Sequence, residues 1–137
     1  MNKKFLIPAL FIFALPTAAL AKPQGFYAGV HYGGIDGSPA GSGPGFNMGY
    51  QGDSGWGVHG EFTRDTLVTF GGVFGTYRTS GDVYFLAKGG VVGGRSTSGI
   101  AGGVGIGVNA GSAFNVELDA NAYGDRGVAN LRLSYSF

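Results

Sequence analysis

The last ten residues of the sequence, 128–137, alternate strictly between apolar and polar side chains. The apolar positions are Ala129, Leu131, Leu133, Tyr135 and Phe137. The polar positions between them are Asn130, Arg132, Ser134 and Ser136. This period of two predicts a β-strand with one apolar and one polar face, because successive side chains of a strand point to opposite sides. Most domains end in a loose polar tail. A final strand as regular as this one is typical of a closing strand. Such a strand closes a sheet by pairing with the strand before it and with the first strand.

The beginning of the sequence predicts export. Residues 1–4 include two lysines, residues 5–15 form an apolar run broken only by a proline, and Ala19 and Ala21 form a small-residue cleavage site. This order is that of a secretory signal peptide, and the apolar run is too short to span a membrane. We expect residues 1–21 to be removed, with an uncut N-terminal anchor as the alternative. No cysteine follows the site, which excludes a lipoprotein anchor.

Residues 22–137 would then form a single domain of 116 residues. It contains all 29 glycines of the chain and no cysteine, so disulfides and thiolate metal sites are excluded. Its 7 basic and 8 acidic residues provide no basic patch for nucleic acid. A secreted domain this small needs another source of stability, and lipid around a closed hydrogen-bond network supplies one.

Alternating patterns recur along the domain and predict eight strands joined as hairpins. The predicted strands are 25–33, 44–51, 55–63, 67–77, 82–92, 99–109, 113–123 and 128–137. Their number, their length of about 9 to 11 residues and their alternation are typical of the smallest transmembrane barrels. We therefore predict an all-β fold, an eight-stranded antiparallel up-and-down transmembrane β-barrel.

Segment 67–77 has the least regular pattern. Phe70 and Phe74 share one parity, while Val73 lies on the other. A bulge at Gly71–Gly72 is one way to shift the phase of this strand, and the sequence leaves its phase open.

The two faces of the strands differ in size as well as polarity. The small, polar face includes Gly29, Gly49, Gly57, Gly103, Gly105 and Gly107. An eight-stranded barrel has a narrow interior that side chains fill, so we assign this face to the interior, with a few large residues such as Tyr27, Tyr84 and Tyr123. The bulky apolar face would then meet lipid, with aromatic girdles near the strand ends. The alternative is a soluble all-β domain with the faces reversed.

With a periplasmic N-terminus, alternate connections face outward. The outward connections are 33–43, 64–66, 93–98 and 124–127, and the periplasmic turns are 51–54, 78–81 and 110–112. The longest is 33–43, whose Gly-Ser-Pro composition is typical of a flexible connector.

The signal peptide, the eight strands and the terminal Tyr-Ser-Phe together resemble the small outer-membrane β-barrel proteins of Gram-negative bacteria, of the OmpX and OmpA-transmembrane-domain type. The resemblance implies export by the general secretory route, periplasmic chaperones and insertion by the barrel assembly machinery. It also implies outer-membrane lipid and lipopolysaccharide as surroundings, and a monomer. The assembly signal that it implies consists of Leu131, Leu133, Tyr135 and Phe137. Adhesive members carry long outward loops and those predicted here are short, which weakens an adhesive role.

Several charged or ionisable side chains fall on the predicted inner face near its middle. They are His31, His59, Glu61, Lys88, Glu117, Asp119 and Arg132. We expect Glu117 and Asp119 to lie near Arg132, with Lys88 reaching across the lumen. Buried charges need partners, so we interpret the set as an ion-pair and hydrogen-bond network that fills the barrel. The alternatives are a gated ion path and a metal site at His31, His59 and Glu61, although His59-x-Glu61 alone is a weak metal signal.

An enzyme is disfavoured by the same pattern. A barrel that modifies lipid A needs a nucleophile and base at the lipid face or outer loops. Both histidines of the chain point inward on the predicted parity, and no nucleophile–base pair is visible. The sequence thus predicts a non-enzymatic outer-membrane barrel with a structural or surface-interaction role and no cofactor. Passage of a small solute or ion through a gated lumen is the alternative, followed by a lipid-modifying enzyme.

Overall fold

The computed structural model describes residues 25–37, 40–65, 68–111 and 113–137. The predicted signal peptide, with Ala19 and Ala21, lies outside the described residues. No helix within these ranges is long and apolar enough to cross a membrane.

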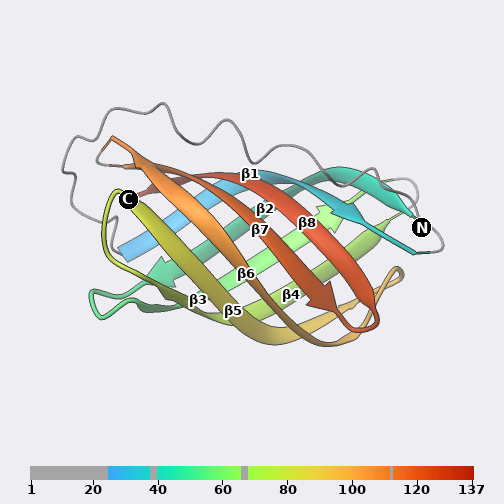
Figure 1. Cartoon of the computed structure of the whole chain (residues 1–137). Helices are drawn as coiled ribbons and strands as arrows, with labels where there is room; N and C mark the ends of the chain where they lie inside the picture. Colours follow the sequence, from blue (N-terminus) through green and yellow to red (C-terminus); the bar gives the residue numbers. More distant parts are fainter. Residues whose placement is uncertain (1–24, 38–39, 66–67, 112) are drawn as a thin grey trace.

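Eight antiparallel strands form a closed barrel in which each strand pairs with its neighbours in sequence (Figure 1). The strands are β1 (Gly25–Ile35), β2 (Gly41–Gln51), β3 (Trp56–Arg64), β4 (Thr69–Arg78), β5 (Val83–Gly94), β6 (Gly99–Ala110), β7 (Phe114–Tyr123) and β8 (Arg126–Ser136). The predicted fold class is confirmed.

The barrel closes where β8 meets β1. Arg132 of β8 lies opposite Glu117 of β7 on one side and opposite His31 of β1 on the other. The last strand therefore pairs on both edges, as its regular alternation predicts.

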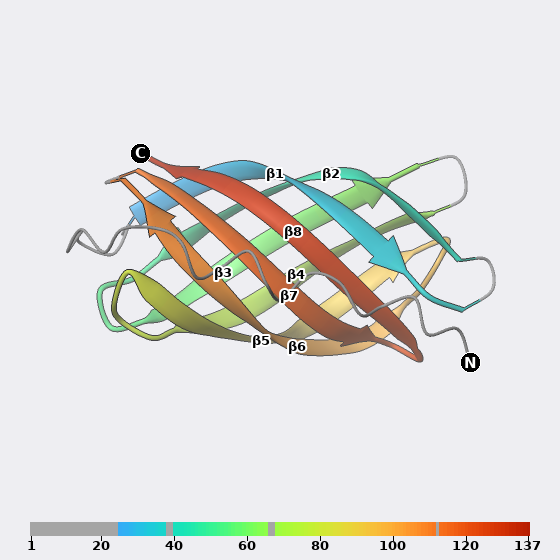
Figure 2. The same cartoon turned by 45° about the horizontal axis from the view of Figure 1, so that its top comes forward.

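The strands run obliquely to the long axis of the barrel in both views (Figure 2). They are 9 to 12 residues long. At about 3.3 Å per residue and a tilt of about 35–45°, they give a wall roughly 25 Å tall. We call the end with the β1–β2, β3–β4, β5–β6 and β7–β8 connections the loop end, and the opposite end the turn end.

The outer face carries the bulky apolar side chains. Val30, Val73 and Val104 are each more than 60% exposed along the middle of their strands. The inner face carries many of the glycines and most of the buried polar residues, among them Asn47 and Arg132, which are each 1% exposed. The faces thus lie as the alternation predicts.

Outward aromatic side chains are most numerous at the turn end. Ring pairs join Phe26 to Tyr50, Trp56 to Tyr77 and Phe114 to Tyr135, with centroids 5.0 to 5.2 Å apart. At the loop end the exposed aromatics lie on β1 to β3 and are Tyr32, Phe46 and Phe62. The predicted girdle is therefore broad at the turn end and one-sided at the loop end.

The connection between β1 and β2 is shorter than predicted. Gly33 pairs with Gly43 and Ile35 with Gly41, so most of the predicted loop 33–43 belongs to the two strands. The prediction was wrong because it took glycine and serine as loop residues. Glycine pairs in a ladder through its backbone, and its composition alone does not reveal this.

The phase of β4 is settled without a bulge. Pairing with β3 and β5 runs without a break through Gly71–Gly72. Phe70 and Phe74 point into the barrel, and Val73 points out. Gly72 permits this, because a Cβ there would lie 2.7 Å from the Phe74 ring.

Two adjacent glycines of β5 offer a matched test of the narrow interior. A Cβ at Gly90 would collide with the backbone carbonyl of Val73, whereas one at Gly89 would find its nearest atom 4.0 Å away. Gly90→Ala should therefore lower the free energy of unfolding by about 1–3 kcal/mol, the usual cost of overpacking. Gly89→Ala should change it by less than about 0.5 kcal/mol. Urea titration followed by the fluorescence of the single tryptophan, Trp56, measures both. Equal losses would contradict this packing.

Candidate functional site in the barrel interior

Eight ionisable side chains are buried inside the barrel. They comprise three acidic, three basic and two histidine residues: Glu61, Glu117, Asp119, Arg78, Lys88, Arg132, His31 and His59. The formal charges of the acidic and basic groups balance among the described residues. All seven residues singled out from the sequence lie on this inner face, together with Arg78.

Glu61 of β3 is the centre of the larger group. Its carboxylate accepts hydrogen bonds from Lys88 at 3.2 Å and from the Arg132 guanidinium. His59 Nε2 lies 3.0 Å from the same carboxylate, and the Tyr123 hydroxyl donates to it. Residues from β3, β5, β7 and β8 thus converge on one carboxylate whose side chain is fully buried.

Asp119 of β7 extends the group on the other side. It pairs with Arg132 and lies 3.8 Å from Lys88. The amide groups of Asn130, at 3.0 Å, and of Asn121 donate to it. Arg132 and Lys88 therefore lie between two carboxylates, which is how buried charges are stabilised. We call Glu61, Asp119, Lys88 and Arg132 the central charge cluster.

Arg78 and Glu117 form a separate pair nearer the turn end. Arg78 Nη2 donates to Glu117 Oε1 at 2.9 Å, and its Nη1 donates to Gln51 Oε1 at 2.8 Å. Glu117 lies opposite Arg132 in the ladder, but it forms its ion pair with Arg78. Arg78 was predicted to begin the turn 78–81, but it is the last residue of β4. Its parity with Thr76 and Phe74 is the signal that would have found it, once β4 extends to residue 78.

The two histidines have different surroundings. His59 Nδ1 lies 2.7 Å from the Tyr27 hydroxyl, so Tyr27, His59 and Glu61 form a hydrogen-bonded chain. His31 Nε2 lies 2.7 Å from Thr63 Oγ1, away from Glu61. Within the described ranges, no group of three or more His, Cys, Asp or Glu is placed to hold a metal ion.

The Tyr27–His59–Glu61 chain has the order of a proton relay, and all three of its side chains are buried. Tyr27 and His59 are 4% and 2% exposed, and Glu61 is held by Lys88 and Arg132. A substrate needs a concave site of several hundred Å³. The cavity described below is far smaller than this.

A small polar cavity lies at the turn end. Its volume is about 10 Å³, and its lining includes Arg78, Tyr84, Asn109 and Asn115. This volume has room for about one water molecule.

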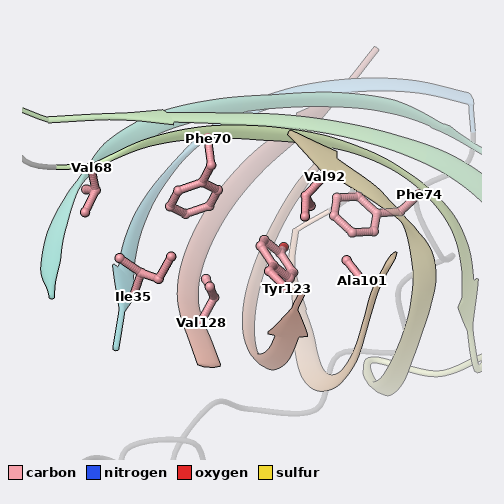
Figure 3. Packing of buried hydrophobic residues seen from close by; sticks show 8 residues of the cluster. All are labelled: Ile35, Val68, Phe70, Phe74, Val92, Ala101, Tyr123 and Val128. Atoms are coloured by element: carbon pink, nitrogen blue, oxygen red, sulfur yellow. The ribbon is translucent and has the colours of Figure 1, made fainter. Parts of the chain in front are cut away.

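An apolar cluster lies toward the loop end of the interior, beside the buried polar residues Thr63 and Asn121. Figure 3 shows the residues of this apolar cluster, which are Ile35, Val68, Phe70, Phe74, Val92, Ala101, Tyr123 and Val128. The Tyr123 ring lies 5.8 Å from that of Phe70 and 5.5 Å from that of Phe74. The prediction of a polar lumen with a few large residues such as Tyr123 did not include the two phenylalanines, because the phase of β4, which supplies both, could not be read.

Hydrogen bonds tie the loop-end connections together above this cluster. Arg126 Nε donates to the Asp36 carbonyl and its Nη1 to the Ser96 carbonyl, each at 2.7 Å. Gly127 N donates to Asp36 Oδ1 at 2.7 Å. Three connections, those after β1, β5 and β7, are thus joined through one arginine and one aspartate.

Removing the charge of Glu61 tests the central charge cluster. Glu61→Gln keeps the shape but leaves Lys88 and Arg132 with one carboxylate, so the free energy of unfolding should fall by about 3–5 kcal/mol. Asp53→Asn, in an exposed turn, removes the same charge and should change it by less than about 0.5 kcal/mol. Urea titration in detergent measures the two. A loss below about 1 kcal/mol for Glu61→Gln would show that the cluster contributes little.

Comparison with known proteins places the chain by its fold. No protein-family model and no curated protein sequence matches it. Among solved structures, the N-terminal β-barrel domain of Pseudomonas aeruginosa OprF matches with a TM-score of 0.56 and 13% identity, over 85% of this chain and 100% of that one. The Yersinia pestis outer membrane protein Ail in a phospholipid bilayer nanodisc matches with a TM-score of 0.52 and 16% identity, over 83% and 100%. The chain therefore has the fold of the small eight-stranded outer-membrane β-barrels.

Proposed function

We propose that this protein is a non-enzymatic integral barrel of the Gram-negative outer membrane, with a structural or surface-interaction role. The observation that carries the proposal is the reversed distribution of side chains. Val30, Phe85 and Val104 are 61 to 68% exposed on the outside, while Glu61 and Arg132 are buried inside. A soluble protein rarely exposes an apolar patch above about 300–600 Å², and here the apolar face surrounds the barrel.

The dimensions of the wall support a membrane setting. A height of roughly 25 Å matches the apolar band of transmembrane barrels. Closure between β1 and β8 leaves no sheet edge, which lipid would not tolerate. The outward aromatics at the turn end, such as Trp56 and Tyr77, suit the interface of such a band.

The interior supports a role without catalysis. Its histidines are buried among Tyr27, Glu61 and Thr63, where no lipid substrate reaches them. The balanced charges fill the middle of the barrel. We therefore favour a filled lumen over passage of solutes.

We propose that the loop end faces the cell surface and the turn end the periplasm. The loop-end rim carries positively and negatively charged side chains. Arg64, Arg95 and Asp125 are exposed there. These groups suit contact with lipopolysaccharide head groups or with a polar surface ligand. The connections are short, so such contacts would be made by a compact rim.

Insertion would use the signal that the family resemblance implies. Leu131, Leu133 and Tyr135 lie on the outer face of β8, at 43 to 54% exposure, and Phe137 follows the strand at 80%. We propose that these four residues are read by the barrel assembly machinery after transport by periplasmic chaperones, and that the inserted barrel is a monomer.

Heat modifiability tests the proposed location and the closed barrel together. The outer-membrane fraction is run on a denaturing gel with and without boiling. An unheated barrel should stay folded in detergent because its backbone hydrogen bonds close on themselves, so boiling should shift the band. A protein found in the soluble periplasmic fraction, with no shift, would overturn the proposal.

A charge on the outer face separates a lipid-facing wall from a water-facing one. Val104 lies in the middle of β6 and is 66% exposed. Val104→Arg should lower the free energy of unfolding in lipid by about 2–4 kcal/mol if it meets hydrocarbon. In water such a change at an exposed site costs less than about 0.5 kcal/mol. Ser54→Arg in an exposed turn is the control and should be neutral. A neutral Val104→Arg would contradict the lipid-facing assignment.

A further inference from the structure

We propose that the turn end of the barrel interior holds one fixed water molecule, which bridges the side chains of Tyr84, Asn109 and Asn115. These residues belong to three successive strands, β5, β6 and β7. The water is a structural ligand that completes the hydrogen bonding of the interior at this end of the barrel.

Three buried oxygen atoms at the turn end lack a partner in the protein. Tyr84 Oη, Asn109 Oδ1 and Asn115 Oδ1 make no hydrogen bond, although their residues are only 1%, 6% and 7% exposed. Buried polar groups nearly always have a partner, and an ordered water serves where the protein supplies none. All three residues line the cavity of about 10 Å³, which has room for one water molecule.

The two asparagines do not satisfy each other. They lie directly opposite in the ladder between β6 and β7, so their side chains are neighbours on the inner face. The amide nitrogen of Asn109 donates to the Gly81 carbonyl at 3.2 Å, which fixes the direction of its amide group. The atoms left over are carbonyl oxygens, which only accept hydrogen bonds. A separate donor is therefore needed for both.

A glycine brings the Tyr84 hydroxyl to the same region. Tyr84 lies opposite Gly107 in the ladder, and a Cβ on Gly107 would collide with the ring and the hydroxyl of the tyrosine. The side chain therefore reaches over β6, and Asn109 lies two residues further along the same face of that strand. A hydroxyl donates as well as accepts, so Tyr84 can donate to a water that in turn donates to the two amides.

The charge of the cavity lining favours a neutral ligand. Arg78 lines the cavity, but its guanidinium donates to Glu117, Gln51 and Thr76. The pairing with Glu117 leaves no uncompensated carboxylate for a cation and no uncompensated guanidinium for an anion. A small neutral molecule with two donors fits the three oxygens, and water has these properties.

The bridge would add side-chain links between strands that the backbone ladder already joins. The Arg78–Glu117 ion pair connects β4 to β7. The water connects β5, β6 and β7 through Tyr84, Asn109 and Asn115. Side chains of four successive strands are then held together at the turn end.

A crystal structure of the wild-type protein that resolves ordered water tests the proposal directly. One water should lie about 2.7–3.2 Å from both Asn109 Oδ1 and Asn115 Oδ1 and accept a hydrogen bond from Tyr84. Crystals soaked in rubidium chloride distinguish water from a cation, because rubidium scatters anomalously, and no anomalous peak should appear at the site. The absence of a water at these oxygens, or a rubidium peak there, would overturn the proposal.

Coupling between two variants tests the bridge in solution. Tyr84→Phe and Asn115→Ala are made singly and together, and unfolding in urea is followed by Trp56 fluorescence. The two side chains make no hydrogen bond to each other, so their coupling has to pass through the water. The change in the unfolding equilibrium constant of the double variant should differ at least about twofold from the product of the single changes.

Tyr84→Phe combined with Asn130→Ala is the matched control. Asn130 also has a buried oxygen without a partner, but it does not line the cavity. The effects of this pair should multiply. Effects of Tyr84→Phe and Asn115→Ala that multiply in the same way would contradict the bridge, and the wild-type crystal structure decides if a variant does not fold.

Discussion

The interior of an eight-stranded barrel is so narrow that several of its large side chains need a glycine beside them. A Cβ at Gly49 would meet the Tyr27 hydroxyl, and one at Gly107 would meet the Tyr84 ring. Gly72 leaves the same kind of space for Phe74. The high glycine content is therefore a packing requirement of the inner face. The strands keep their regular pleat because backbone pairing, unlike side-chain packing, does not need a Cβ.

This narrowness also determines how charge is held. The three carboxylates and three basic groups inside lie close enough to pair across strands that are not neighbours, as Glu61 does with Lys88 and Arg132. Pairs of this kind cost several kcal/mol to break, because the remaining charge stays buried. They tie opposite walls together. Tyr123 joins this central layer to the apolar layer, since its hydroxyl contacts Glu61 while its ring packs on Phe70.

The period of two predicted much of this arrangement. Alternation alone predicts the number of strands and the closure of the barrel. It also predicts that residues such as His59 and Lys88 point inward. Two features did not follow. In β4 the inward positions hold phenylalanines and the outward ones include Gly71 and Gly75, so polarity gave no phase. The partner of Glu117 was also missed. The ladder places Arg132 opposite it, but side-chain length and the position of Arg78 across the lumen decide the pairing. Such contacts between separated strands depend on barrel curvature, which no local pattern contains.

The two layers hold opposite walls of the barrel together in different ways. In the central layer, Arg132 contacts both Glu61 and Asp119. In the apolar layer, the rings of Phe70 and Phe74 pack on that of Tyr123. Opening it would separate Phe70 from Tyr123 and expose both to water, at about 25 cal/mol for each Å² uncovered. Salt should affect neither layer strongly, because the side chains of the ion pairs are 0 to 1% exposed and the apolar contacts carry no charge.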